Sequence, residues 1–177
     1  MKALSTESWS ESHVFLVPEE NKIIKFYWNL DDVDIKRYAL LQNYVANLWT
    51  IELFLEEIET GYEYILITSF LKLGAIWRRF SYWLSGAKAI ECFATEQEYI
   101  KWWFLDEIME TELPLIIADR LNSEGIKYVP ELLASWNMKV TKTELNGKIV
   151  VNIVITDMAT SIKQLLVANK DFIDNIF

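Results

Sequence analysis

Residues 139–156 read KVTKTELNGKIVVNIVIT and contain the strongest local structural signal in the chain. Two runs rich in β-branched residues flank the dipeptide Asn146-Gly147. Asn-Gly is the preferred pair for a type I′ turn, which joins two antiparallel strands through two residues with positive φ. We therefore predict a β-hairpin with strands from Lys139 to Leu145 and from Lys148 to Thr156.

A second hairpin is predicted near the N-terminus. Residues 12–18 (SHVFLVP) and 22–30 (KIIKFYWNL) are rich in β-branched and aromatic residues, and the segment PEEN between them supplies turn residues. Asp31, Asp32 and Asp34 follow the second strand. Carboxylates at such positions cap free N–H groups and suit the positive end of the helix dipole, so these acids predict the start of a helix.

The middle of the chain is predicted to be helical. Apolar residues at three- and four-residue steps predict one helix from residue 31 to about 60 and a second, apolar nearly all round, over 62–85. Thr95 and Glu98 form a capping box that predicts a third helix, broken or kinked at Pro114 and continued to Asn122.

Two more helices are expected after Pro114. Residues 130–136 are predicted to form a short helix, because proline suits the first helical turn. A last helix is predicted from Met158 to about Asp174, with Thr156 or Asp157 as its cap. The sequence thus predicts one α+β domain over residues 1–177, with N-terminal and C-terminal β-hairpins framing a helical middle and a C-terminal helix.

Composition and charge exclude several classes of partner. The net charge of −9 argues against general affinity for nucleic acid and against docking to anionic membranes, both of which depend on Lys and Arg. One cysteine and one histidine allow no internal disulfide and are too few for a typical zinc site. The first residues lack an apolar signal core. We expect a cytoplasmic protein without metal, cofactor or membrane association.

No motif for catalysis stands out. The five glycines form neither a P-loop nor a dinucleotide-binding fingerprint. Cys92 and His13 could pair only through the fold, since their spacing fits no known nucleophile motif. We therefore expect a protein without enzymatic activity.

Two acidic stretches are the candidate binding surface. On a helix that turns 100° per residue, Trp102 falls on the apolar side and Trp103 on the opposite side, among acids. Glu52, Glu56, Glu59 and Glu63 follow helical spacing and form a second acidic row, with Trp49 just before it. The predicted partner-binding residues are Trp103, Asp106, Glu107, Glu110, Trp49, Glu52, Glu56 and Glu59.

The leading hypothesis is an acidic protein-binding module, of the inhibitor, immunity-protein or antitoxin type. It would neutralise a basic effector such as a nuclease toxin by occluding the basic site, with tryptophan as the anchor and carboxylates steering the encounter. One alternative is a protein, or an enzyme, that binds a small apolar ligand in an aromatic-lined pocket. Another is a homo-oligomeric subunit that buries Trp49 and Trp103 in its interface. In a further interpretation, another element of the fold covers Trp103, and the surrounding acids form a solvated rim.

Overall fold

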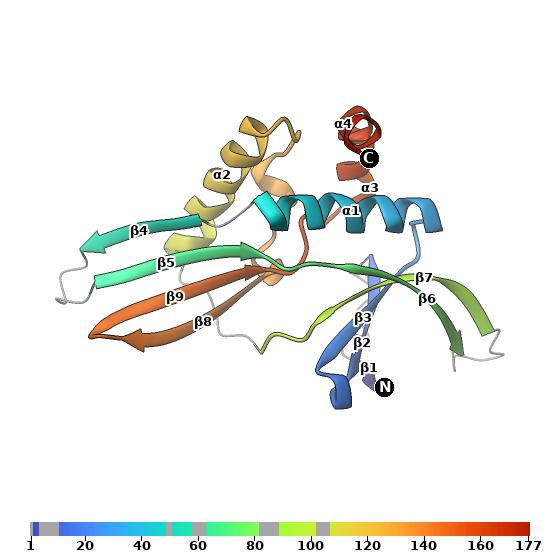
Figure 1. Ribbon diagram of the computed structural model, residues 1–177, viewed down its shortest axis with the longest axis horizontal. Helices are drawn as coiled ribbons and strands as arrows, with labels where there is room; N and C mark the ends of the chain where they lie inside the picture. Colours follow the sequence, from blue (N-terminus) through green and yellow to red (C-terminus); the bar gives the residue numbers. More distant parts are fainter. Residues whose placement is uncertain (1, 4–10, 49–50, 58–62, 82–88, 102–106) are drawn as a thin grey trace.

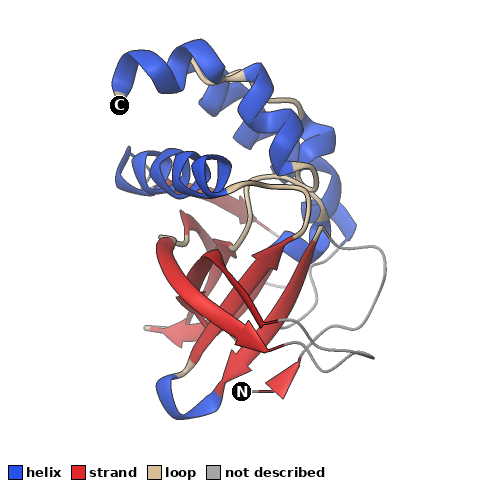
Figure 2. Cartoon of the chain, turned by 90° about the vertical axis from the view of Figure 1, so that its right-hand side faces the viewer, coloured by secondary structure: helices blue, strands red, loops and turns tan. Residues whose placement is uncertain are grey.

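The computed structural model describes residues 2–3, 11–48, 51–57, 63–81, 89–101 and 107–177. Within these ranges the chain forms two β-sheets and four α-helices, which confirms the predicted α+β class (Figure 1). The helices gather on one side of the strands, as both overall views show (Figures 1 and 2). None of the described helices is long and apolar enough to span a membrane.

The first sheet has the strand order β1-β2-β3-β7-β6, and all its neighbouring strands are antiparallel. Its strands are β1 (Lys2–Ala3), β2 (Ser12–Val17), β3 (Lys22–Tyr27), β6 (Gly74–Ser81) and β7 (Ala89–Glu98). The 3₁₀ helix η1 (Pro18–Glu20) and Asn21, with φ of 51°, turn the chain between β2 and β3. The predicted N-terminal hairpin is therefore confirmed.

The second sheet has the order β4-β5-β9-β8. Its strands are β4 (Ile51–Glu57), β5 (Glu63–Phe70), β8 (Met138–Leu145) and β9 (Lys148–Ile155). β8 and β9 form the predicted hairpin, in which Leu145 lies opposite Lys148 and the φ angles of Asn146 and Gly147 are 53° and 75°. β5 and β9 are parallel, so the long segment between them crosses from one end of the sheet to the other.

The helix predicted over residues 31–60 is present only up to residue 48, and the helix predicted over 62–85 is wrong. The first begins as predicted, because the N–H of Asp34 donates to the Asp31 carboxylate at 2.8 Å, but α1 (Asp32–Leu48) ends before β4. Residues 62–85 contain β5 and β6 instead of a buried helix. β5 lies between β4 and β9, and a strand with partners on both sides has the same nearly continuous apolar sequence as a buried helix.

The capping box predicted at residues 95–98 is also wrong. Thr95 and Gln97 belong to β7, where they lie opposite Lys25 and Ile23 of β3. The following helix, α2 (Glu107–Ser123), runs through Pro114 without the predicted break. Leu113, Pro114 and Ile117 are buried, and this packing offsets the backbone hydrogen bond that proline removes.

The C-terminal region differs from the prediction in its helix boundaries. Two 3₁₀ helices, η2 (Pro130–Leu132) and η3 (Ser135–Asn137), replace the short helix. The last helix is divided into α3 (Ile162–Ala168) and α4 (Lys170–Ile176), and Ser161 caps α3 by accepting from the N–H of Gln164. Thr156 and Asp157 do not cap it, because Thr156 hydrogen-bonds to Asn137 and Asp157 faces Lys25.

The main core lies between the helices and one face of the second sheet. Val140, Ile153 and Ile155 are buried there with residues of α1, α2 and α3. Side chains alternate across a strand, so Lys139 points to the opposite face of β8 from Val140. Lys139, at the start of β8, lines a cavity together with residues of β2, β3 and β7 of the first sheet.

Candidate functional site

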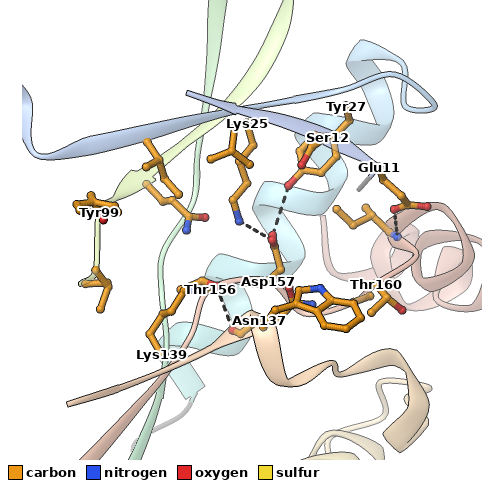
Figure 3. A pocket seen from close by; sticks show the side chains of 17 residues that line it. Glu11, Ser12, Lys25, Tyr27, Tyr99, Asn137, Lys139, Thr156, Asp157 and Thr160 are labelled. Carbon is orange, nitrogen blue, oxygen red and sulfur yellow. Dashed lines mark hydrogen bonds and ion pairs between the residues drawn. The ribbon is translucent and has the colours of Figure 1, made fainter. Parts of the chain in front are cut away.

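A cavity of about 430 Å³ lies between strands of the two sheets (Figure 3). One wall comes from β2, β3 and β7, where Val14 lies opposite Lys25 and Ile23 lies opposite Gln97. The other wall comes from the end of η3, the start of β8 and the segment after β9. This second wall includes Asn137, Lys139, Thr156, Asp157, Ala159 and Thr160.

A buried ion pair crosses the cavity from one wall to the other. The Lys25 ammonium group, on a side chain only 6% exposed, pairs with Oδ2 of Asp157, and Figure 3 shows the two groups meeting. A buried ammonium group is costly unless a counter-charge and hydrogen bonds compensate it. Lys25 belongs to β3 and Asp157 follows β9, so the pair links the two sheets.

Two tyrosines complete the environment of this carboxylate. Oδ1 of Asp157 lies 3.3 Å from the hydroxyl of Tyr27 and 3.1 Å from that of Tyr38. The Tyr38 hydroxyl also accepts from the N–H of Met158 at 3.0 Å and lies 2.7 Å from Oε1 of Gln42. Burial, followed by the nearby Asp157 carboxylate, raises the pKa of both tyrosines well above the ordinary value. Both hydroxyls therefore remain protonated donors. We name Lys25, Tyr27, Tyr38, Gln42 and Asp157 the Asp157 network.

Lys139 brings a second cation to the cavity. Burial is the main cause that lowers the pKa of this half-buried lysine, and the Lys25 ammonium lowers it further. The Asp157 carboxylate acts in the opposite direction. Lys139 therefore lies in the fields of both the Lys25 ammonium and the Asp157 carboxylate.

Two amide side chains in the cavity lining are buried without hydrogen-bond partners. Gln97 is 3% exposed and Asn137 is 5% exposed. Among the described residues, neither Nε2 nor Oε1 of Gln97 has a partner, and Nδ2 of Asn137 has none. Leaving a buried polar group unpaired costs about 1–3 kcal/mol. Native proteins contain few such groups, so each one needs an explanation.

The remaining lining is aromatic and apolar. Trp136 is 70% exposed at the edge of the cavity, and Tyr27 and Tyr99 line its interior. Aliphatic surface comes from Val14, Ile23, Ile100, Ala159 and Ile162. A mainly apolar lining with a few polar groups that converge on the interior is typical of small-molecule sites.

Glu11 is the second carboxylate of the lining, and it is held at the far end. Its Oε2 accepts from the N–H of Ile162 at 2.9 Å, and its Oε1 accepts from the Asn29 side chain at 3.0 Å. Figure 3 shows Glu11 and Lys139 at opposite ends of the cavity. The acidic and basic ends are thus separated, with the ion pair of Lys25 and Asp157 between them.

The predicted partner-binding residues are not brought together in this cavity. Trp103, Asp106, Trp49 and Glu59 lie outside the described residues. Glu107 and Glu110 begin α2, while Glu52 and Glu56 belong to β4. The helical row of glutamates is therefore wrong, since Glu52 lies opposite Ile67 and Glu56 opposite Tyr64 in a strand pair.

Sequence reasoning missed the residues that form the site. One signal was present: Lys25 lies between Ile24 and Phe26 in a strand that is apolar on both faces, which requires a buried partner for its charge. Asp157 was interpreted as a helix cap and Gln97 as part of a capping box. The pairing of Lys25 with Asp157 spans 132 positions, and no local pattern predicts it.

The chain matches no protein-family model, no curated protein and no solved structure. Within the described ranges, no group of three or more His, Cys, Asp or Glu side chains could hold a metal ion. The arguments below therefore rest on the geometry of the cavity.

Proposed function

We propose that the protein binds a small organic ligand in the cavity between its two sheets. The observation that carries this proposal is that, within the described residues, the buried Gln97 amide and the buried Asn137 amide nitrogen in the cavity lining have no hydrogen-bond partner. An apolar residue of similar size would avoid the energetic cost of each unpaired amide. A ligand that hydrogen-bonds to them explains why such costly groups are present on both walls.

The size and lining of the cavity support the same function. A volume of about 430 Å³ falls within the range of roughly 300–1,000 Å³ that small-molecule sites occupy. Tyr99 and Trp136 offer aromatic surface, as the sequence-based alternative of an aromatic-lined pocket expected. Lys139 and the two amides make the lining more polar than that alternative assumed, so the ligand carries polar groups as well as an apolar part.

A fragment screen with a cavity-filling variant tests this function. Ligand-observed NMR identifies fragments that bind the wild-type chain, and thermal melts record the stabilisation that binding produces. Val14→Trp fills the cavity from the first sheet and should abolish binding of these fragments. Thr143→Trp, at an exposed position of β8 outside the lining, is the matched control and should bind normally. Fragments that bind Val14→Trp as well as wild type would contradict the proposal.

A second candidate function is the binding of a basic protein, as an inhibitor or immunity-type protein does. It is supported by the net charge of −9 and by the exposed tryptophans Trp28, Trp77 and Trp136, since tryptophan is enriched among interface hot spots. The partner-binding residues proposed for this candidate are Trp103, Asp106, Glu107 and Glu110.

Its test starts with a partner isolated from the native host and then purified. Trp103→Ala should weaken binding by about 2 kcal/mol and leave the free energy of unfolding nearly unchanged. Changing Asp106, Glu107 and Glu110 to amides should mainly slow association. If Trp103→Ala costs several kcal/mol of stability without a specific binding defect, the residue is a core residue and this candidate fails.

A further inference from the structure

Among the described residues, two of the three cavity-lining side-chain atoms that are buried without a hydrogen-bond partner are donors. Ammonium groups donate only, and the amide nitrogens of Gln97 and Asn137 are also donors. Oε1 of Gln97 is the acceptor without a partner among the described residues. The Asp157 carboxylate already accepts from Lys25, Tyr27 and Tyr38. A ligand that completes these interactions must bring acceptors.

The charges in the cavity favour a ligand with a negative group. Lys139 lies near the Lys25 ammonium, which lowers its pKa, and near the Asp157 carboxylate, which raises it. Asp157 itself forms an ion pair with Lys25. Glu11 lies at the opposite end from Lys139 and is held by Ile162 and Asn29 (Figure 3). An anion placed beside Lys139 would reduce the repulsion between the two ammonium groups, in a partly buried site where charge interactions are weakly screened.

Lys139 and Asn137 are placed to hold such an anion together. They are two residues apart, and Met138 between them has the extended φ and ψ values of −111° and 126°. Side chains separated by two positions in extended backbone point to the same side. The two oxygens of a carboxylate can therefore accept from the Lys139 ammonium and the Asn137 amide at once. Such charge-assisted hydrogen bonds are stronger than neutral ones.

We infer that the cavity binds a small organic acid, with its carboxylate on Lys139 and Asn137 and its apolar part against Ile23, Ile100 and Trp136. This inference rests on the proposed ligand-binding function and adds the chemical class of the ligand. The apolar lining selects an organic acid over an inorganic anion, because an inorganic anion leaves that surface uncovered. The Asn137 amide lines the cavity, and its Nδ2 has no hydrogen-bond partner among the described residues.

Matched pairs of acids and neutral amides test the inference directly. The probes are phenylacetate with phenylacetamide, benzoate with benzamide and butyrate with butyramide, with inorganic phosphate as a further anion. Titration of the full chain is followed by ¹H–¹⁵N NMR, because the side-chain NH₂ groups of Asn137 and Gln97 report on the site themselves. We expect each acid to bind about tenfold more tightly than its amide and to shift the Asn137 NH₂ signals.

Variants at lysine positions identify the group that selects the acid. Lys139→Met should reduce the preference for the acid to about twofold or less, while the spectrum shows that the variant is folded. Lys127→Met, at an exposed lysine outside the cavity lining, is the control and should keep the full preference. A preference that survives in Lys139→Met overturns the inference, and Lys139→Gln repeats the test if the methionine variant does not fold.

The remaining outcomes separate this inference from the proposed function. If acids and amides bind with equal affinity and shift the signals of Gln97 and Asn137, the inference of an organic acid is wrong, but the proposed binding of a ligand in the cavity is retained. Phosphate that binds at Lys139 as tightly as the acids also overturns it. No binding of either series at the cavity residues contradicts both the inference and the proposed function.

Discussion

Two sets of buried polar groups lie side by side in this protein, and they differ in whether their hydrogen bonds are made. In the Asp157 network, the carboxylate accepts from one ammonium and two hydroxyl groups. In the same cavity lining, the Gln97 amide and the Asn137 amide nitrogen have no partners within the described part of the chain. A buried polar network that is fully satisfied fixes a structure, whereas an unsatisfied group costs stability.

This difference indicates that the Asp157 network and the cavity amides have separate roles. The Asp157 network connects β3, α1 and the segment after β9, which are far apart in the sequence, and its loss should affect folding. The amides connect nothing in the described structure, and their loss should affect ligand binding. Substitutions in the two sets can therefore test whether their roles are separate.

Asp157→Asn should have the largest effect on stability. It leaves the buried Lys25 ammonium without its counter-charge, and breaking a buried ion pair in this way costs about 3–5 kcal/mol. Urea unfolding of the variant measures the loss. Asp174→Asn is the control, because Asp174 forms exposed ion pairs with Arg37 and Lys170, and it should change stability far less. A double variant, Lys25→Met with Asp157→Leu, should regain most of the loss, and equal losses in Asp157→Asn and Asp174→Asn would refute the structural role.

Tyr38→Phe should have a smaller effect, in the range of about 1–3 kcal/mol. The substitution removes the acceptor of the Met158 N–H and the hydroxyl beside Gln42 and Asp157, and so leaves buried groups unpaired. Tyr44→Phe is the matched control, because the Tyr44 ring packs against Phe172 and Phe177 and phenylalanine keeps that contact. Equal free energies of unfolding for the two variants would show that the Tyr38 hydroxyl contributes nothing to the network.

The sequence predicted the parts of the fold that local chemistry controls. The turn at Asn146-Gly147 and the cap at Asp31 depend on residues within a few positions of each other, and both are present in the structure. β5 instead pairs with β4 and with β9, and β9 is more than 80 positions away in the register that joins Tyr64 to Ile149. Such pairing leaves no local signature, so the apolar run resembled a helix.

The cavity could not be predicted for the same reason. Its walls meet because β3 lies close to the start of β8 and to the segment after β9, which are more than 100 positions away in the sequence. The contact between Lys25 and Asp157 is an example. In the sequence, Gln97 is one polar residue in the segment TEQE, which also satisfies a capping-box pattern. Only the sheet shows that its side chain is buried. Lys25, which has apolar neighbours on both sides in the strand KIIKFYW, was the available signal, and it indicates a buried acid without identifying it.

The lowered pKa of Lys139 should give a small dependence of stability on pH. Burial and the nearby Lys25 reduce the pKa of Lys139 below 10.5 in the folded chain, so the unfolded chain binds more protons just below that pH. The free energy of unfolding contributed by this group therefore rises as the pH rises toward 10.5. Urea unfolding of wild type and Lys139→Met across this range should show a slope that only wild type has. Parallel curves would show that Lys139 is solvated like an exposed lysine.

Gln97→Met should change stability least of all. Methionine has a similar length, and it removes an amide that has no partner among the described residues, so the free energy of unfolding should stay the same or rise by up to about 1 kcal/mol. Gln42→Met is the sharpest control, since Gln42 is equally buried but bonds to Leu71 and Tyr38, and its loss should cost about 1–3 kcal/mol. Gln97→Met should also weaken fragment binding in the cavity, which Gln42→Met should not do in its folded fraction. If the two variants lose the same stability, Gln97 has a structural partner, and the contrast between the network and the cavity amides fails at that residue.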